Sequence, residues 1–302
     1  MLNLPNFEIP IVPILETSDI KISMKREDLI HPQISGNKYW KLFHNVNTYL
    51  HNNKVLPFII TFGGAYSNHI AAVSAFGQLF NIPTLGIIRG EELLDTWKEN
   101  PTLKLAHENG MSFRFVSREV YRDKNSYTRL LEEEFPNALV IPEGGTNSLA
   151  VEGVRMMLNE HTKDFDYLCT AVGTGGTVSG LSKYAEEDQR VLGLNVVRDK
   201  SLSSTVFELS QKNNVIWEDA SFGGYGKIKE DIVQFINAFK IEHNILLDPV
   251  YTGKMMCKVL QLAQENYFPK GANILCFHTG GLQGIAGANI MLQTKNKPRI
   301  EV

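Results

Sequence analysis

Short, continuous apolar runs recur along the chain and are separated by amphipathic stretches. Most of these runs are followed by a glycine-containing turn and then by a helical pattern. Strands that are apolar throughout, rather than at every second position, are typical of a parallel sheet covered on both faces. The pattern therefore predicts an α/β fold in which open, mostly parallel sheets are flanked by helices. The expected strands are residues 55–62, 82–88, 113–116, 138–141, 166–172, 191–197 and 272–277.

A helical pattern begins near Asn37 and has an apolar stripe formed by Tyr39, Leu42, Phe43, Val46 and Leu50. Lys38 lies at the edge of this stripe, and Lys41 follows one turn later. Ser35 and Gly36 supply a cap and a turn before the helix. A helix start, a second cation and partial burial all lower the pKa of an amine, which favours a nucleophilic Lys38. The alternative, more common for a lysine, is a solvated side chain whose stem covers apolar surface.

The turn after the first expected strand reads GGAYSNH and opens an apolar helix. Free backbone N–H groups and the positive end of the helix dipole make this point a natural site for a carboxylate or a phosphate. Ser67, Asn68 and His69 stand at the helix start and add polar side chains. The alternative is that Ser67 only caps the helix, as serine often does.

A second turn leads from a buried strand into a helix, and its glycines let the backbone wrap around an anion. This glycine loop consists of Gly173, Thr174, Gly175, Gly176 and Thr177. It lacks the GxxxxGK[ST] pattern of a Walker A loop, and Val178 stands where a dinucleotide fingerprint has its third glycine. We therefore interpret the loop as a site for a single phosphate, with a purely structural turn as the alternative.

A third strand end, HTGG with Thr279, is weak evidence when taken alone. Three glycine-rich strand ends and one activated lysine together predict a ligand crevice at the carboxyl edge of a parallel sheet. Spacing alone does not name the ligand.

Composition narrows the classes of partner. The chain has 302 residues, a formal charge of −3 and 43% hydrophobic residues, with lysine and arginine scattered, so we expect neither a nucleic acid nor a membrane as a partner. The N-terminus does not resemble a signal peptide, and the tail QTKNKPRIEV is expected to be frayed. Cys169, Cys257 and Cys276 lie far apart, and the first and last are read as small core residues in a reducing, cytoplasmic protein.

Five motifs in order resemble those of the fold-type II pyridoxal 5′-phosphate enzymes, the tryptophan synthase β-like superfamily. They are KREDL with SGNKYWKL, then GGAYSNH, VGTGGTVSG, LLDPVYTGK and HTGG, and they cover nearly the whole chain. Within that superfamily the chain is most similar to the 1-aminocyclopropane-1-carboxylate (ACC) deaminase and D-cysteine desulfhydrase family. The resemblance implies an enzyme with pyridoxal 5′-phosphate as its cofactor and a small amino acid as its substrate.

By that similarity Lys38 would hold the cofactor covalently, and its freed amine would act as the base that removes the α-proton. Lys41, the glycine loop and Thr279 would bind the cofactor, with the phosphate on Lys41 and on the loop backbone. Asn68 would hydrogen-bond the cofactor's ring hydroxyl. Ser67 and its neighbours Asn68 and His69 would bind the substrate, with its carboxylate on Ser67 and the adjoining amides.

Tyr225 in FGGYGK and Tyr251 in DPVYTGK match the family's two active-site tyrosines, and they would contact the substrate and assist catalysis. The alternative for both is an ordinary core or rim aromatic residue. ACC deaminases would have a glutamate where this chain has Thr252 and a leucine where it has Thr279. A neutral hydroxyl near the pyridine nitrogen makes a weaker electron sink, which suffices to expel a thiolate. We therefore expect β-elimination from D-cysteine, with ACC deamination to 2-oxobutyrate as the alternative.

The resemblance also implies two domains with the active site between them. The smaller would be residues 41–150, and the larger would combine residues 1–40 with 151–302. A homodimer is expected from the family. A departure from the family pattern, Glu143 in IPEGGTNSLA, affects the choice of substrate. Two other classes stay open: a nicotinamide-dependent oxidoreductase, which should have an intact GxGxxG, and a cofactor-free amino-acid-binding protein, which should be colourless.

Overall fold

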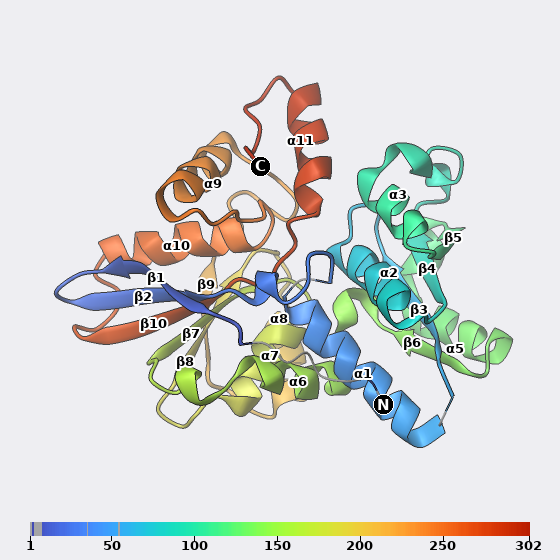
Figure 1. Cartoon of the computed structure of the whole chain (residues 1–302), viewed down its shortest axis with the longest axis horizontal. Helices are drawn as coiled ribbons and strands as arrows, with labels where there is room; N and C mark the ends of the chain where they lie inside the picture. The colour runs from blue at the N-terminus through green and yellow to red at the C-terminus, as the bar shows by residue number, and fades with distance from the viewer. Residues whose placement is uncertain (1, 3–7, 35, 54) are drawn as a thin grey trace.

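Two open sheets form the centre of the molecule in the computed structural model, which describes residues 2, 8–34, 36–53 and 55–302 (Figure 1). The six-stranded sheet has the order β1-β2-β10-β7-β8-β9, and all its neighbours are parallel except the antiparallel pair β1 and β2. Its strands are β1 (Ile11–Glu16), β2 (Ile20–Lys25), β7 (Tyr167–Val172), β8 (Arg190–Asn195), β9 (Val215–Asp219) and β10 (Ala272–Phe277).

The four-stranded sheet is parallel throughout and has the order β5-β4-β3-β6. Its strands are β3 (Phe58–Gly63), β4 (Thr84–Arg89), β5 (Ser112–Val116) and β6 (Ala138–Ile141). All seven apolar runs form strands, and the predicted α/β fold with two mostly parallel sheets is confirmed. β1, β2 and β9 were not predicted. The boundaries of the two domains stay a prediction.

Helices cover both faces of the six-stranded sheet, with α9 and α10 on one side and α6 and α7 on the other (Figure 1). The α-helices are α1 (Asn37–Asn53), α2 (Asn68–Phe80), α3 (Pro101–Glu108), α4 (Arg118–Arg122), α5 (Lys124–Glu134), α6 (Ser148–Val154), α7 (Gly176–Tyr184), α8 (Leu202–Ser210), α9 (Glu230–His243), α10 (Thr252–Gln264) and α11 (Gly284–Thr294). Short 3-10 helices lie at Glu27–Leu29, Glu91–Leu93, Trp97–Glu99, Glu143–Gly145, Arg155–Met157 and Glu160–Thr162.

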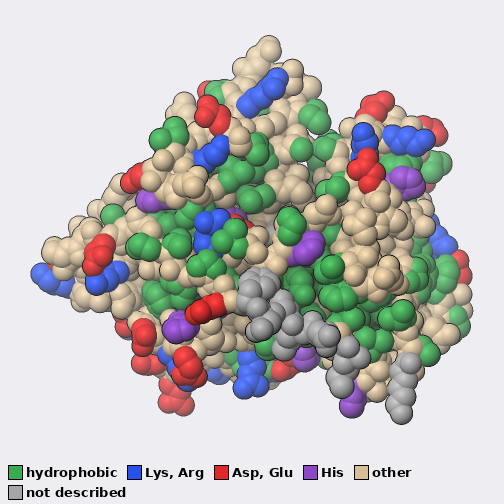
Figure 2. All heavy atoms as spheres, in the orientation of Figure 1, with side chains coloured by type: hydrophobic (Ala, Val, Ile, Leu, Met, Phe, Trp, Pro, Cys, Tyr) green, Lys and Arg blue, Asp and Glu red, His purple; other side chains and the backbone are tan. Residues whose placement is uncertain are grey.

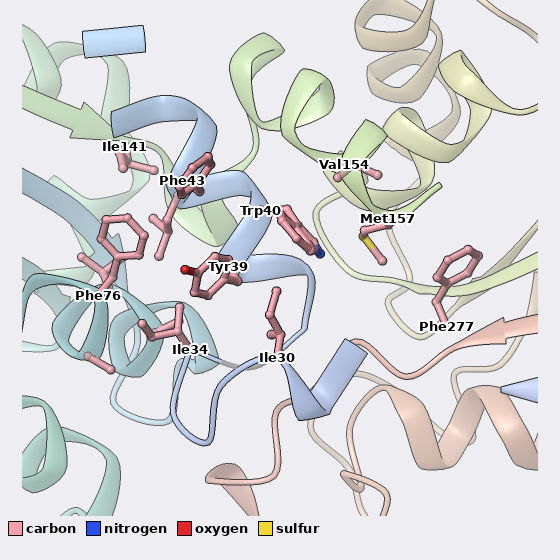
Figure 3. Close-up of a cluster of buried hydrophobic side chains, with 14 of the residues drawn as sticks. Ile30, Ile34, Tyr39, Trp40, Phe43, Phe76, Ile141, Val154, Met157 and Phe277 are labelled. Carbon is pink, nitrogen blue, oxygen red and sulfur yellow. The ribbon is translucent and has the colours of Figure 1, made fainter. Parts of the chain in front are cut away.

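Helix α1 lies between the two sheets, and its aromatic residues fix it there (Figure 1, Figure 3). Tyr39 stacks on Phe43 at 6.2 Å between ring centroids and meets Phe76 of α2 edge-on at 6.4 Å. Trp40 points the other way, toward Met157 (Figure 3). Tyr39 of the predicted stripe therefore packs against α2 on the side of the four-stranded sheet, and the contact on the opposite side is made by Trp40, which the stripe did not include. The predicted cap Ser35 lies outside the described residues.

The prediction of a frayed tail is wrong, because the last residues are held against the molecule. Asn289 of α11 exchanges two hydrogen bonds with the backbone of Ile300, at 2.8 and 2.9 Å, and Ile300 is buried. Asn237 of α9 binds the backbone on both sides of that residue. Two asparagine side chains, which the apolar pattern does not report, hold the last residues against the molecule.

Acidic and basic side chains are interspersed on the face shown in Figure 2, with no stripe of one sign over this face. Among the described residues, none of the helices has the length and apolar character needed to cross a membrane. Cys169 and Cys276 are buried in the register-paired strands β7 and β10, as expected for small core residues.

Candidate active site

A cavity of ≈ 870 Å³ opens at the carboxyl edge of both sheets. Its lining includes residues at or just after the ends of β3, β4, β6, β7, β8 and β10. This is the edge at which parallel α/β sheets bind ligands. All thirteen candidate residues line the cavity: Lys38, Lys41, Ser67, Asn68, His69, Gly173, Thr174, Gly175, Gly176, Thr177, Tyr225, Tyr251 and Thr279. The structure therefore brings all of the candidate residues to one cavity, and the role of each stays a prediction.

The first turn of α1 carries two lysines whose amines are both perturbed. Burial lowers the pKa of Lys38 to about 8, and the charge of Asp248 partly opposes this shift. Lys41 is 2% exposed, and its pKa lies well below the ordinary value because of burial and, secondly, the charge of Lys38. A pKa near 8 leaves roughly a tenth of the Lys38 amine neutral and nucleophilic at pH 7, far more than for an ordinary lysine.

The glycine loop and Lys41 form a cradle that suits a phosphate. A Cβ atom on Gly176 would lie 3.1 Å from Lys41 Nζ and 2.8 Å from Thr146 Oγ1, so both side chains rest against the loop. Gly175 has φ +89° and caps α7, whose first N–H groups face this cradle. Lys41 Nζ makes no hydrogen bond or ion pair with any described residue. A buried cation of this kind needs an anionic partner, and a cofactor phosphate fits.

Ser67 and Asn68 stand at the start of α2 and connect it to the third turn. Ser67 Oγ accepts a hydrogen bond of 3.3 Å from the N–H of Ile70, so the capping geometry proposed as the alternative is present. Asn68 Oδ1 accepts a hydrogen bond of 2.8 Å from Gln283 Nε2, just before α11. A Cβ atom on Gly281 would lie 2.5 Å from Asn68 Nδ2, so only glycine allows this approach.

His69 is a neutral, fixed imidazole in the cavity wall. Its Nε2 lies 2.8 Å from Thr61 Oγ1, and the Thr61 hydroxyl donates its own proton to the carbonyl of Ile141. Nε2 is therefore the protonated nitrogen. Burial first, and then the charges of Lys38 and Lys41, hold the pKa of His69 well below its ordinary value. This residue is 2% exposed, so little of its ring is open to a substrate.

Asp248 is a buried carboxylate of the cavity wall that the sequence reasoning missed. Its Oδ1 accepts hydrogen bonds of 2.8 Å from the N–H groups of Val250 and Tyr251, and its Oδ2 accepts one of 3.1 Å from Thr252 N. The Thr252 hydroxyl accepts a hydrogen bond of 2.9 Å from Asp248 N. Burial raises the pKa of Asp248. Tyr251 is the N-cap residue of α10 and makes no side-chain capping hydrogen bond, so the Asp248 carboxylate, three residues earlier, binds the N–H groups at the helix start instead.

This arrangement corrects the interpretation of Thr252. Thr252 is fully buried, its hydroxyl belongs to the cap of α10, and it is not among the cavity-lining residues. Only Thr279 of the two threonines lines the cavity. The expected weak electron sink therefore depends on the hydroxyl of Thr279 and not on that of Thr252.

The two tyrosines face one another at the rim. The Tyr225 and Tyr251 hydroxyl oxygens lie 3.1 Å apart, and the rings meet edge-on at 6.2 Å between centroids. Burial, and then the neighbouring Tyr225, raises the pKa of Tyr251 well above its ordinary value. Tyr251 therefore keeps its proton at neutral pH and can donate a hydrogen bond. Tyr225 is 59% exposed.

The fold and the cavity are those of an α/β protein that binds its ligand at the carboxyl edge of its parallel sheets. Residues 3–280 match the family described as "Pyridoxal-phosphate dependent enzyme", and the chain belongs to this family. Its cofactor is therefore pyridoxal 5′-phosphate. No group of three or more His, Cys, Asp and Glu side chains placed to hold a metal ion occurs among the described residues.

The comparisons with individual proteins agree with the resemblance. A Pyrococcus horikoshii protein provisionally named 1-aminocyclopropane-1-carboxylate deaminase is 30% identical over 87% of this chain and 85% of its own. A mitochondrial Arabidopsis thaliana protein named bifunctional D-cysteine desulfhydrase/1-aminocyclopropane-1-carboxylate deaminase is 28% identical over 87% of this chain and 72% of its own. The crystal structure of an ACC deaminase homologue superimposes with a TM-score of 0.81 at 27% identity, covering 97% of this chain and 95% of that one. The nicotinamide-dependent and cofactor-free alternatives are thereby excluded.

Proposed function

We propose that this enzyme is a β-eliminating lyase that converts D-cysteine to pyruvate, ammonia and sulfide. The observation that carries the proposal is Thr279, a neutral hydroxyl in the cavity wall at the end of β10. Two of the lining carboxylates already have partners: Asp248 accepts a hydrogen bond from Thr252 N at the start of α10, and Glu143 pairs with Lys124 at 3.1 Å. Without a free carboxylate to keep the ring nitrogen protonated, the cofactor is a moderate electron sink, which suffices for a thiolate leaving group.

In this proposal each residue of the cavity has a separate role. Lys41 and the backbone of residues 173–177 would hold the phosphate, and Lys38 would bind the cofactor covalently until the substrate takes its place and frees its amine. Once bound, pyridoxal phosphate stabilises negative charge at the substrate Cα. The amino terminus of α2, with Ser67, binds the substrate carboxylate, and Lys38 takes the α-proton. Tyr251, which keeps its proton, donates a hydrogen bond toward the leaving sulfur.

The second candidate is ACC deamination. The names of the Pyrococcus and Arabidopsis relatives and of the similar crystal structure support it. Ring opening has no good leaving group, so it makes a greater demand on the electron sink than thiolate expulsion does. This is the physical reason for placing it second.

The test measures 2-oxo acid release from D-cysteine and ACC side by side, with L-cysteine and D-serine as comparators. We expect pyruvate with sulfide from D-cysteine and no 2-oxobutyrate from ACC. Turnover of ACC at a rate comparable to D-cysteine would contradict the argument from Thr279. It would show that a neutral hydroxyl environment sustains ring opening.

The lowered pKa of Lys38 gives a pH prediction for cofactor capture. Only a neutral amine attacks the cofactor aldehyde, and below pH 8 most Lys38 amines are protonated. The rate at which cofactor-depleted enzyme captures pyridoxal phosphate should therefore rise about tenfold per pH unit below 8 and level off above it. Stopped-flow absorbance measures this rate. A rate that keeps rising to pH 10 would indicate an ordinary lysine.

We also propose a cytoplasmic location and a homodimer. The three cysteines are free thiols, which suits a reducing compartment. The dimer is proposed from the resemblance to the family.

A further inference from the structure

The cavity extends beyond the lysines and the glycine loop to a second charged end. At ≈ 870 Å³, a volume that the cofactor and the substrate share, it lies toward the upper end of the range of about 300–1,000 Å³ that encloses drug-sized ligands. Arg89 and Glu143 line this end, with Tyr225 at its rim. The proposed function uses neither charged residue.

Arg89 is held next to the turn that is proposed to bind the substrate carboxylate. It is the last residue of β4, and β4 pairs in parallel with β3, whose end continues into that turn. The guanidinium Nη2 would lie 3.4 Å from a Cβ atom on Gly64, so it packs against the first residue of the turn. Its Cζ stands 5.6 Å from the ring centroid of Tyr121, a buried tyrosine of α4. The strand and the aromatic ring thus place the guanidinium of Arg89, an exposed residue, at the cavity wall.

The charge of Arg89 is not neutralised within the described part of the chain. Its guanidinium makes no hydrogen bond or ion pair there, whereas Arg118, which also lines the cavity, pairs with Glu92 at 2.9 Å. A second lining carboxylate, Glu143, pairs with Lys124. The ammonium nitrogen of Lys124 also stands over the Tyr121 ring, 4.7 Å from the ring centroid. Each nearby carboxylate therefore has its own cation, and the fork of Arg89 is left for a ligand.

We propose that Arg89 binds an anionic group at the end of the substrate side chain, so that the enzyme favours β-substituted amino acids with an acidic leaving group. This inference rests on the proposed β-elimination and names its substrate class. A planar guanidinium pairs with a carboxylate through two parallel hydrogen bonds, which makes Arg89 a specificity-determining residue.

S-Carboxymethylcysteine represents this class. The α-proton goes to the base, the Cβ–S bond breaks, and its electron pair leaves on sulfur as thioglycolate. One water molecule is consumed, and pyruvate and ammonia are the other products. No oxidant or reductant is needed, because the reaction is an elimination followed by hydrolysis.

The experiment compares kcat/KM of the holoenzyme for three thioethers of both configurations: S-carboxymethylcysteine, neutral S-methylcysteine and cationic S-(2-aminoethyl)cysteine. We expect the wild-type enzyme to prefer the acidic substrate. Arg89→Gln should lower the ratio of acidic to neutral turnover by about ten- to hundredfold, the range for a lost charged hydrogen bond. Arg89→Lys keeps the positive charge but loses the planar guanidinium, so its ratio of acidic to neutral turnover should fall between those of the wild type and Arg89→Gln. The control is Arg114→Gln on the adjacent strand β5, whose guanidinium pairs with Glu134 outside the cavity at 2.7 Å.

Two outcomes overturn the inference. An unchanged ratio in Arg89→Gln would show that the guanidinium does not read the side chain, and an equal loss for all three substrates would assign it to the α-carboxylate. If no thioether releases pyruvate, turnover of D-cysteine decides about the proposed elimination, and calorimetric binding of the same compounds decides about Arg89. Tighter binding of the acidic compound that is lost in Arg89→Gln would support the inference, and equal binding would overturn it.

Discussion

Replacing Lys38 with alanine is expected to lower kcat/KM on the order of 10³-fold or more, the largest effect of any substitution in this enzyme. The substitution removes the proposed covalent attachment of the cofactor and the proposed base for the α-proton, and positioned proton transfer alone contributes about 10²–10⁴-fold. Cofactor should still bind through its phosphate, because Lys41 and the glycine loop are untouched. The measurements are turnover of D-cysteine and the amount of pyridoxal phosphate fixed to the protein by borohydride.

The matched variant is Lys41→Met, one turn further along the same helix. Lys41 Nζ lies against Gly176, so its loss should weaken cofactor binding while borohydride still fixes the cofactor to Lys38 at saturating concentration. Loss of one charged hydrogen bond corresponds to about 1.5–3 kcal/mol, or roughly ten- to hundredfold in the dissociation constant. If borohydride instead labelled Lys38→Ala and failed to label Lys41→Met, the roles of the two lysines would be reversed.

The central strands that the sequence predicted are buried on both faces, whereas the predicted edge strands β5 and β6 are mostly half-buried. β7 and β4 are apolar throughout, or nearly so, because helices cover both sides of their sheets. Two of the missed strands, β1 and β9, differ from these central strands. β1 contains Pro13 and has a register shift there, and β9 is half-buried along most of its length. Edge strands of this kind lack a continuous apolar run, and their pairing depends on neighbours that are distant in sequence.

The candidate site was predictable where its signal is local. Glycine turns and a lysine at a helix start are each visible within a few residues, and the structure gathers all of them around one cavity. Arg89 and Asp248 were missed because single arginines and aspartates have no local signature. Thr252 was placed wrongly for a related reason. Its hydroxyl faces Asp248 rather than the cavity, and the direction of a side chain at a helix start depends on what caps the helix.

The KREDL segment is expected to stabilise the fold through a buried ion pair. Lys25 Nζ lies 3.4 Å from Glu27 Oε1, with the two side chains 2% and 0% exposed, and it donates a hydrogen bond of 2.6 Å to the carbonyl of Met157. Glu27 Oε2 in turn accepts a hydrogen bond of 2.7 Å from Trp40 Nε1. Glu27 therefore ties β2 and the segment before α1 to the helix that carries both lysines.

Lys25→Met should reduce the free energy of unfolding by about 3–5 kcal/mol at neutral pH, because it leaves the Glu27 carboxylate buried without a cation. The double variant Lys25→Met/Glu27→Gln should lose less than the sum of the two single variants, since neither unpaired charge remains. Urea unfolding followed by fluorescence measures each variant. The control is Lys21→Met on the same strand, because Lys21 pairs with Glu16 at the exposed surface and its loss should change stability little.

The loss in Lys25→Met should also depend on pH in a defined direction. Burial already raises the pKa of Glu27 above its ordinary value of 4.5, and Lys25 is the main group that opposes the rise. Removing Lys25 raises the folded-state pKa further, while the unfolded chain still ionises near 4.5. The charge-dependent part of the loss relative to the wild type is therefore absent below the wild-type folded pKa of Glu27, grows from there to the higher folded pKa of the variant, and is constant above it. A loss that is equal at pH 5 and pH 8, or no larger than that of Lys21→Met, would show that the charge of Glu27 does not need Lys25.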